Sequence, residues 1–367
     1  MIYLDNGATS FPKLPAVKRA AVRAMNRCAN PGRGGHKPAM QAAKTLFSCR
    51  ETASGMFDCT PEQVVFTANC THGLNIAIHS LVQPGSRVVI TGFEHNAVVR
   101  PLHACNAKIV VAGRRLFDWD DTLTEFEKAL QSGVSAAVFT HCSNVFGYIL
   151  PVQELAQLCH RYGVPFVLDA AQSAGVLPIS LRKLGADFIA MPGHKGLLGP
   201  MGTGILLCGS GAKPLMQGGT GSDSKNPAMP SFLPDALEAG TANVSGIAGL
   251  EAGMGWVKNT GIDKILRREQ QAAKYCAERL QKLGFRVFSG ENQGGTVSFV
   301  GDTDCETLAQ MRAQKGIAVR AGLHCAPLAH ESAGTLETGT VRVSFGHHAS
   351  CRQADALLTH LHNFKKR

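Results

Sequence analysis

Residues 165–173, PFVLDAAQS, and residues 188–200, FIAMPGHKGLLGP, share one layout, in which a short apolar run leads directly into small and polar residues. Apolar runs of this length, bounded by turn-forming residues, are typical of buried strands. In an open α/β sheet, the residues that follow the strands line the crevice where ligands bind. The two stretches therefore predict an α/β fold with Asp169, Gln172 and Lys195 at one binding site.

Apolar runs of strand length alternate with helix-length segments between residues 64 and 208. This alternation predicts a mainly parallel sheet covered by helices on both faces. The predicted strands are Val64–Thr67, Arg87–Thr91, Lys108–Val111, Ala136–His141, Pro165–Asp169, Phe188–Met191 and Gly204–Cys208. The predicted helices are Leu14–Asn26, Ala39–Phe57, Gly73–Leu81, Leu123–Gln131 and Gln153–Tyr162.

The composition changes after Cys208, where residues 209–235 are rich in Gly, Ser and Pro and predict a long loop. Helices over 246–259 and 262–283 then lead into a smaller α+β region. Its predicted strands are Arg286–Ser289, Thr296–Val300, Ala318–Arg320 and Thr340–Phe345, and its helices are Cys305–Gln314 and Arg352–Phe364. Because 367 residues exceed the size of a single core, we expect two domains. These are a large domain over 15–245 and a small domain over 246–367, with residues 1–14 packing against the small domain.

The composition narrows the class of protein. The formal charge of +10 is dispersed rather than clustered and aromatic residues are few, so we expect no nucleic-acid partner. No apolar run is long enough to cross a bilayer, and the first residues do not resemble a signal peptide, so the expected location is cytoplasmic. The twelve cysteines lack the paired spacing of zinc sites, and we expect most to be buried and reduced, without a metal.

Three side chains at the predicted crevice match the needs of pyridoxal 5′-phosphate (PLP). Lys195, in a turn rich in glycine, offers an amine that can form an imine with the cofactor's aldehyde. Asp169 can keep the pyridine nitrogen protonated, and Gln172 can donate to the ring's 3′-oxygen. Taken alone, an aspartate here would more often be a helix cap and a lysine a surface residue. Their combination favours the PLP interpretation.

Further polar residues follow other predicted strands. Cys70 and Thr71 open a helix whose N-terminal N–H groups suit a phosphate, and His194 adds a possible donor. His95 can stack on a ring or move protons, and Asn144 can reach a ring or a substrate. Each residue would be weak evidence by itself.

The chain resembles the class V, fold-type I PLP enzymes, and among them the NifS/Suf-type (group II) cysteine desulfurases and the related selenocysteine lyases. The resemblance runs almost from end to end, through YLDNGAT (3–9), RGGH (33–36), TANCTHGLN (67–75), EHNAVV (94–99), HCSNVFG (141–147), LDAAQS (168–173), GHKGLLGP (193–200), EAGTANV (238–244), RAGLHCAP (320–327) and ETGTVRVSFG (337–346). It implies a large domain with a seven-stranded, mainly parallel sheet, a smaller C-terminal α+β domain and a homodimer.

The resemblance also implies roles for particular residues. Lys195 would hold PLP, with Asp169 on the pyridine nitrogen, Gln172 on the 3′-oxygen and His95 stacked on the ring. The phosphate would be bound by Thr71, His194 and Thr241 of the partner subunit. Arg342 would bind the substrate carboxylate with help from Asn144, and His36 would lie near the substrate channel.

Cys325 distinguishes a desulfurase from its relatives, because in this family the cysteine at this place attacks the substrate's sulfur and becomes a persulfide. It lies in a loop bounded by Gly and Pro, and nearby cations such as Arg320 or His324 would favour the thiolate. The implied reaction converts L-cysteine to L-alanine and passes sulfur to Cys325, from which a sulfur-acceptor protein would take it.

Three departures from the family pattern indicate a divergent branch. Pro192 replaces a serine that donates to the phosphate, the phosphate turn reads Asn69-Cys70-Thr71, and Asn96 stands where a second histidine is common.

Three alternative functions stay open. They are a selenocysteine lyase acting on L-selenocysteine, a class V aminotransferase or β-lyase, and, more remotely, a non-catalytic sulfur- or metal-binding protein.

Overall fold

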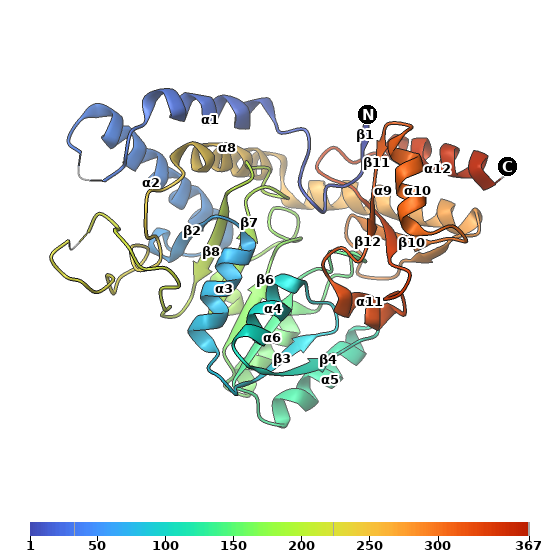
Figure 1. Ribbon diagram of the computed structural model, residues 1–367, viewed down its shortest axis with the longest axis horizontal. Coiled ribbons are helices and arrows are strands. Elements are labelled where there is room, and N and C mark those ends of the chain that lie inside the picture. Colours follow the sequence, from blue (N-terminus) through green and yellow to red (C-terminus); the bar gives the residue numbers. More distant parts are fainter. Residues whose placement is uncertain (33, 223, 366–367) are drawn as a thin grey trace.

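A seven-stranded sheet forms the main part of the molecule in the computed structural model, which describes residues 1–32, 34–222 and 224–365 (Figure 1). Its strand order is β2-β8-β7-β6-β5-β3-β4. The strands are β2 (Val64–Thr67), β3 (Arg87–Thr91), β4 (Lys108–Ala112), β5 (Ala136–Thr140), β6 (Phe166–Asp169), β7 (Phe188–Pro192) and β8 (Gly204–Cys208). Strands β3 to β7 pair in parallel, whereas β8 runs antiparallel to both of its neighbours. The predicted mainly parallel sheet is confirmed.

Helices cover both faces of this sheet. Alternate strand residues point to opposite sides, and the residues on both sides are apolar. Val88 and Ile90 pack on the face covered by α3 (Cys70–Leu81) and α4 (Asn96–Ala104). Val89 packs on the other face, in a larger apolar core. That core is covered by α2 (Lys37–Phe57), α5 (Trp119–Gln131), α6 (Val152–Arg161) and α8 (Val244–Thr260). The strands are apolar on both sides because both sides are buried.

A second, four-stranded antiparallel sheet has the order β12-β13-β10-β9. Its strands are β9 (Arg286–Phe288), β10 (Thr296–Val300), β12 (Arg320–Gly322) and β13 (Thr340–Ser344). Helices α9 (Ile262–Lys282), α10 (Cys305–Ala313) and α12 (Cys351–Lys365) contribute to this smaller part. Its apolar core is separate from the cores of the large sheet. The predicted α+β character of this region agrees with these elements.

The N-terminal segment lies against the smaller part, where both ends of the chain are drawn in Figure 1. Strand β1 (Ile2–Tyr3) pairs in parallel with β11 (Ile317–Ala318), and Asp5 bridges to Ser344. The single strand predicted over Ala318–Arg320 is wrong, because β11 pairs with β1 whereas β12 joins the four-stranded sheet. Domain boundaries at residues 14 and 245 stay a prediction.

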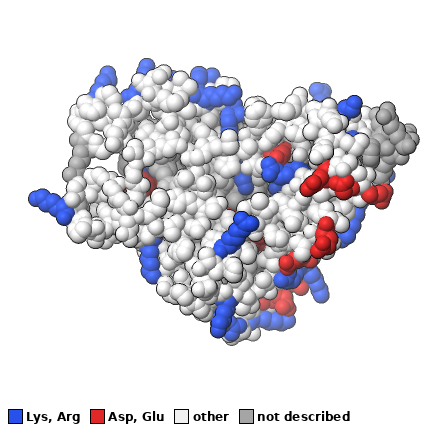
Figure 2. Space-filling view, in the orientation of Figure 1, with Lys and Arg blue, Asp and Glu red and all other residues white. Residues whose placement is uncertain are grey.

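The remaining elements are α1 (Pro15–Arg27), a 3-10 turn η1 (Pro61–Gln63), α7 (Leu181–Leu184) and α11 (Pro327–Ala333). Between β8 and α8, the described residues contain no helix or strand, in agreement with the predicted loop. On the face shown in Figure 2, lysines and arginines lie at separate places rather than in one continuous patch. None of the helices in the described ranges combines the length and the apolar character that spanning a membrane requires.

Candidate active site

Asp169 and Lys195 lie at the same edge of the large sheet. Asp169 is the last residue of β6, and Lys195 follows the end of the neighbouring parallel strand β7 by three residues. Asp169 and Ala190 are partners across the two strands. Because parallel strands end at one edge, the two side chains meet in the crevice that the sequence predicts.

The Asp169 carboxylate is buried and has one open oxygen. Its Oδ1 atom accepts a hydrogen bond from the backbone N–H of Ala171 (2.9 Å) and one from the Cys70 thiol (3.5 Å). The other carboxylate oxygen, Oδ2, has no hydrogen-bond partner in the described part of the chain. Burial raises the pKa of Asp169, whereas the Ala171 N–H and the nearby Lys195 amine lower it. A cation placed on Oδ2 would therefore be stabilised by a carboxylate that lacks a full set of partners.

The Lys195 amine has no hydrogen bond or ion pair within the described residues. Burial lowers its pKa, and the nearby Cys70 and Asp169 partly oppose that effect. Arg342 and Arg320 lower the pKa further. A lysine with a lowered pKa supplies the neutral amine that imine formation requires.

The glycines around Lys195 allow the chain to pack against itself. A Cβ atom on Gly196 would collide with the backbone oxygen of Ala174, and one on Gly199 would lie 2.9 Å from the backbone oxygen of Gly193. These glycines therefore let the Lys195 turn fold tightly against neighbouring backbone.

The first turn of α3 is open for an anion. Asn69 caps the helix by accepting from the His72 N–H (2.9 Å), which leaves the N–H groups of Cys70 and Thr71 without a partner in the described residues. Thr71 is exposed and Cys70 is buried beside Asp169. Unpartnered N–H groups at a helix N-terminus suit a phosphate, as the sequence predicts.

His194 is held by the N-terminal segment. Its Nδ1 atom lies 3.1 Å from the Thr9 hydroxyl, and its backbone oxygen accepts from Lys13 Nζ (2.7 Å) and from Ser10. Burial, together with the nearby Lys195 and Lys13, lowers the pKa of His194 to about 4. At neutral pH its imidazole is therefore uncharged, and any interaction with an anion would depend on hydrogen bonding alone.

His95 occupies the N-terminus of α4, where its Nδ1 atom accepts from the Ala97 N–H (2.9 Å). Burial, with the charges of Lys195 and Arg342, lowers the pKa of His95 to about 4. These electrostatic interactions place His95 in the same site as Lys195. It is a neutral ring there, suited to stacking on another ring.

Arg342 is the centre of a charged cluster. It donates to Asp5 Oδ1 (2.7 Å) and to the backbone oxygen of Asn144 (2.9 Å). Asp5 also accepts from Arg320 Nε, at 3.0 and 3.2 Å. The Asn144 amide donates to the backbone oxygen of His324 (2.8 Å). Arg342 and Asn144, both predicted to bind substrate, are thus in direct contact.

Cys325 is exposed on the loop between β12 and α11. Its backbone oxygen accepts from the Asn96 N–H (2.8 Å), which places the loop next to the first turn of α4 and hence beside His95. His324 and Cys325 both have positive φ, at +48° and +58°. A non-glycine residue in this region costs about 1–3 kcal/mol, and such strain often accompanies functional sites.

The expectation that His324 supplies a cation beside Cys325 is wrong. His324 is buried, and its Nε2 atom lies 3.2 Å from both oxygens of Thr340. Burial, reinforced by Arg342, lowers the pKa of His324 to about 2. The ring is therefore neutral across the physiological range.

Three predicted site residues have other contacts or lie apart. Gln172 donates to the backbone oxygen of Gly7 (3.0 Å). His36 is exposed and caps α2 by accepting from the Ala39 N–H (3.4 Å). Thr241 is exposed in the loop that leads to α8. Arg33, which begins the predicted RGGH element, lies outside the described residues.

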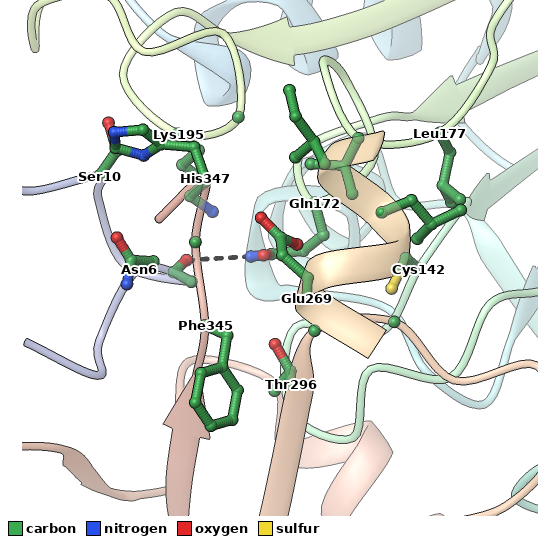
Figure 3. A pocket seen from close by; sticks show the side chains of 18 of the residues that line it. Asn6, Ser10, Cys142, Gln172, Leu177, Lys195, Glu269, Thr296, Phe345 and His347 are labelled. Atoms are coloured by element: carbon green, nitrogen blue, oxygen red, sulfur yellow. Dashed lines mark hydrogen bonds between the residues drawn. The ribbon is translucent and has the colours of Figure 1, made fainter. Parts of the chain in front are cut away.

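A cavity of about 50 Å³ adjoins this site (Figure 3). Lys195 and Gln172 line it together with Glu269 of α9 and His347, which follows β13. Both nitrogens of His347 are buried and have no hydrogen-bond partner among the described residues. Burial raises the pKa of Glu269 to about 8, and burial lowers that of His347 to about 4. Both are neutral near pH 7, so these two residues make the cavity polar while adding little charge to it.

The residues present fit PLP. An unpartnered lysine amine lies near an aspartate with an open oxygen, and free N–H groups at the start of α3 suit the phosphate. No group of three or more His, Cys, Asp or Glu side chains arranged for a metal ion occurs in the part of the chain that the structure describes.

Sequence reasoning missed several residues of the site. Asp5 and Gly7 lie in the motif YLDNGAT, which was used for the resemblance without any role for its residues. Lys13 contacts the His194 backbone, and Glu94 is fully buried and accepts from Thr91 (2.6 Å) and from the Thr140 N–H (3.0 Å). A charged residue on the apolar face of an amphipathic helix, such as Glu269 between Ile265 and Ala272 in α9, is the signal that could have indicated the cavity.

Known proteins resemble this chain over nearly its whole length. Residues 2–357 match the model of the family described as "Aminotransferase class-V". A "Probable cysteine desulfurase" of Pyrococcus abyssi is 32% identical over 98% of this chain and 92% of its own length. A protein of the same name from Methanothermobacter thermautotrophicus is 30% identical over 97% and 92%.

A solved structure shows the same similarity. The apo cysteine desulfurase from Thermococcus onnurineus superposes with a TM-score of 0.91, at 29% identity, over 100% of this chain and 94% of that one. This overlap includes both the large sheet and the smaller C-terminal part. The chain therefore belongs to the aminotransferase class-V family.

Proposed function

We propose that this protein is a PLP-dependent cysteine desulfurase, which converts L-cysteine to L-alanine and retains the sulfur as a persulfide on Cys325. One observation carries the proposal. The unpartnered Lys195 amine interacts electrostatically with Asp169 and Arg342, and the exposed Cys325 loop contacts the first turn of α4 beside His95. Similarity to proteins named cysteine desulfurase supports the proposal.

Bound PLP would supply an electron sink for the bonds of the substrate's α- and β-carbons. Asp169 would hold the pyridine nitrogen, and Gln172 would turn from the Gly7 oxygen to the 3′-oxygen. Thr71, His194, the free N–H of Cys70 and Thr241 of the partner subunit would bind the phosphate. His95 would stack on the ring as a neutral imidazole.

Lys195 is the base of the proposed reaction. Its neutral amine would take the proton from the α-carbon of the substrate and would return a proton later in the reaction. Arg342 and Asn144 hold the substrate carboxylate, which fixes the α-carbon in front of Lys195. The lowered pKa of Lys195, caused first by burial, keeps the amine available for this transfer.

Cys325 takes the sulfur. Its thiolate forms an S–S bond with the substrate sulfur as the Cβ–S bond breaks, and the electron pair of that bond stays with the substrate. The β-carbon of the substrate then gains a proton, and the product leaves as L-alanine. The net change moves one sulfur atom from the substrate to Cys325, whose thiol becomes a persulfide, so no outside oxidant or reductant is needed.

The proposal includes a homodimer, the cytoplasm as location and a sulfur-acceptor protein. The homodimer would explain why Thr241 is exposed here, since it would act in the partner's site. The twelve scattered cysteines fit a reducing compartment. An exposed Cys325 suits transfer of sulfur to another protein.

The test is turnover of L-cysteine by the holoenzyme, with alanine, pyruvate and protein persulfide measured together. Cys325→Ala should keep the PLP absorbance and lose the persulfide, whereas Cys351→Ala, at a half-buried cysteine on α12, should behave like the parent. Alanine and persulfide from L-selenocysteine alone would identify a selenocysteine lyase. Pyruvate or a keto acid would identify a β-lyase or aminotransferase. A colourless protein without PLP would refute the proposal.

A further inference from the structure

An ion pair covers the free edge of the large sheet at β2. This strand stands first in the strand order, so its outer N–H and C=O groups meet no further strand among the described residues. Glu238 Oε1 accepts from the Phe66 N–H (2.6 Å), and Arg50 donates to the Val64 oxygen. Arg50 and Glu238 also bind each other, at 2.5 Å. Together the two side chains take the place of a neighbouring strand.

The pair has little freedom to move. The Arg50 side chain is 10% exposed and that of Glu238 is 17% exposed. The Arg50 guanidinium also lies over the Phe66 ring, with Cζ 4.4 Å from the ring centroid. A charge at this depth is costly without its partner, so separating the two residues is strongly unfavourable. Glu238 is therefore held at a fixed place on β2.

Glu238 belongs to the long loop between β8 and α8. This loop lies on the side of the large sheet where α2 and β2 are drawn in Figure 1, and its described residues form no helix or strand. Ala236 and Leu237, directly before Glu238, are buried in the apolar core beneath α3. The loop is thus anchored to the sheet immediately before residues 239–242.

Thr241 lies between two fixed points. Glu238 is three residues before it, and Asn243 is two residues after it. Asn243 caps α8 by accepting from the Gly246 N–H (2.9 Å), and it donates to the Gly202 oxygen (3.1 Å). Thr241 itself is exposed and has no hydrogen bond within the described residues. The chain therefore fixes the backbone on both sides of a threonine whose hydroxyl is free to bind a group outside this subunit.

We propose that Arg50 and Glu238 are positioning residues, which hold Thr241 in place for the cofactor phosphate of the partner subunit. The inference rests on the proposed function, including the homodimer, and adds the residues that fix the donor. Protection of a sheet edge alone would also explain the ion pair. The two explanations differ in which subunit of the dimer loses PLP when the pair is broken.

The test uses mixed dimers of the full-length chain in which one subunit carries Lys195→Ala, so that only the other site holds PLP as an imine. In the first arrangement, Glu238→Gln is on the Lys195→Ala subunit, whose Thr241 serves the imine site. In the second arrangement, Glu238→Gln is on the subunit that keeps Lys195. The decay of the imine absorbance after removal of free PLP gives the dissociation rate in each dimer.

The reference is a mixed dimer with Lys195→Ala and no other change. PLP should dissociate about tenfold faster from the first arrangement, because hydrogen bonds to charged groups are stronger than neutral ones. Tenfold corresponds to about 1.4 kcal/mol. The second arrangement should match the reference. Glu127→Gln, which breaks an exposed ion pair with Arg161 (3.0 Å), should leave the rate unchanged in either arrangement.

A second readout follows the loop itself. Lys225 is exposed on this loop, and trypsin should cut after it faster in a homodimer with Glu238→Gln than in the parent or in Glu127→Gln. Arg50→Lys keeps the charge but has one ammonium group for two acceptors. In the first arrangement it should speed the loss of PLP, but less than Arg50→Gln does. Arg50→Lys also tests the inference if Glu238→Gln fails to fold.

The outcomes separate the two proposals. Equal rates in the two arrangements, or faster loss of PLP only in the second, would overturn the positioning role and leave the desulfurase proposal standing. Tryptic cleavage after Lys225 at the parental rate would overturn the anchoring of the loop. A parent that is monomeric or retains no PLP would overturn the inference together with that part of the proposed function. Production of alanine from L-cysteine tests the desulfurase proposal independently.

Discussion

Replacing Glu269 with glutamine should make the protein more stable, and increasingly so as the pH rises. Glu269 is 7% exposed on α9 and has no hydrogen bond or ion pair within the described residues. Burial raises its pKa from an ordinary 4.5 to about 8. Glutamine has nearly the same shape and cannot ionise, so the Glu269→Gln variant removes the titration with little change in packing.

The direction in which the free energy of unfolding changes with pH follows from which state, folded or unfolded, holds the Glu269 proton. Above about pH 4.5 the unfolded chain releases the Glu269 proton, but the folded protein keeps it until about pH 8. The folded state then binds more protons, so the free energy of unfolding falls as the pH rises through this window. The loss is about 1.4 kcal/mol per pH unit, and the full shift corresponds to about 5 kcal/mol at most.

Urea unfolding at several values between about pH 5 and pH 9 measures this effect. The difference in unfolding free energy between Glu269→Gln and the parent should be small near the lower limit, grow through neutral pH and level off above about pH 8. Glu278→Gln, at an exposed position on the same helix, serves as the control and should show no such growth. A constant difference across the range would refute the reasoning, because only a titration produces the slope.

Three other results are expected. Borohydride reduction of the holoenzyme should leave a pyridoxyl group on Lys195, and a label found on another residue would contradict the site assignment. Nitrogen NMR of His95 should show a neutral ring down to about pH 5, because burial lowers its pKa to about 4; a midpoint near 6.5 would contradict that. Gly196→Ala should lower the unfolding free energy by about 1–3 kcal/mol, since the new methyl group meets the Ala174 backbone. Urea unfolding measures this last result, with Gly211→Ala as the control, because a Cβ atom at Gly211 meets nothing within 4 Å.

The elements of the large sheet could be predicted because their signal is local. Runs such as Val64–Thr67 and Gly204–Cys208 are apolar, short and bounded by turn residues, and the structure has these two strands with the predicted bounds. The strand predicted over Ala318–Arg320 failed for the opposite reason. Its division into β11 and β12 depends on pairing with β1, more than 300 residues away, and no local pattern contains that partner.

The candidate site likewise contains some contacts that the sequence predicts and others that it does not. Asp169 and Lys195 follow adjacent parallel strands, so their proximity could be derived from the strand pattern. The contact of Asp5 with Arg342 could not, because it joins residues 337 positions apart. The charge state of His324 also escaped prediction, since its pKa depends on burial that only the folded loop creates.

The contact between Asp5 and Arg342 has a consequence for biosynthesis. A ribosome makes residue 5 long before residue 342, and domains generally fold from the N-terminus during synthesis. The large sheet is complete once Cys208 has emerged, yet the first strand and the carboxylate after it must wait for β11 and β13. Until then the large sheet is folded but the Asp5–Arg342 contact is missing, so we expect the nascent protein to stay inactive until β13 has been made.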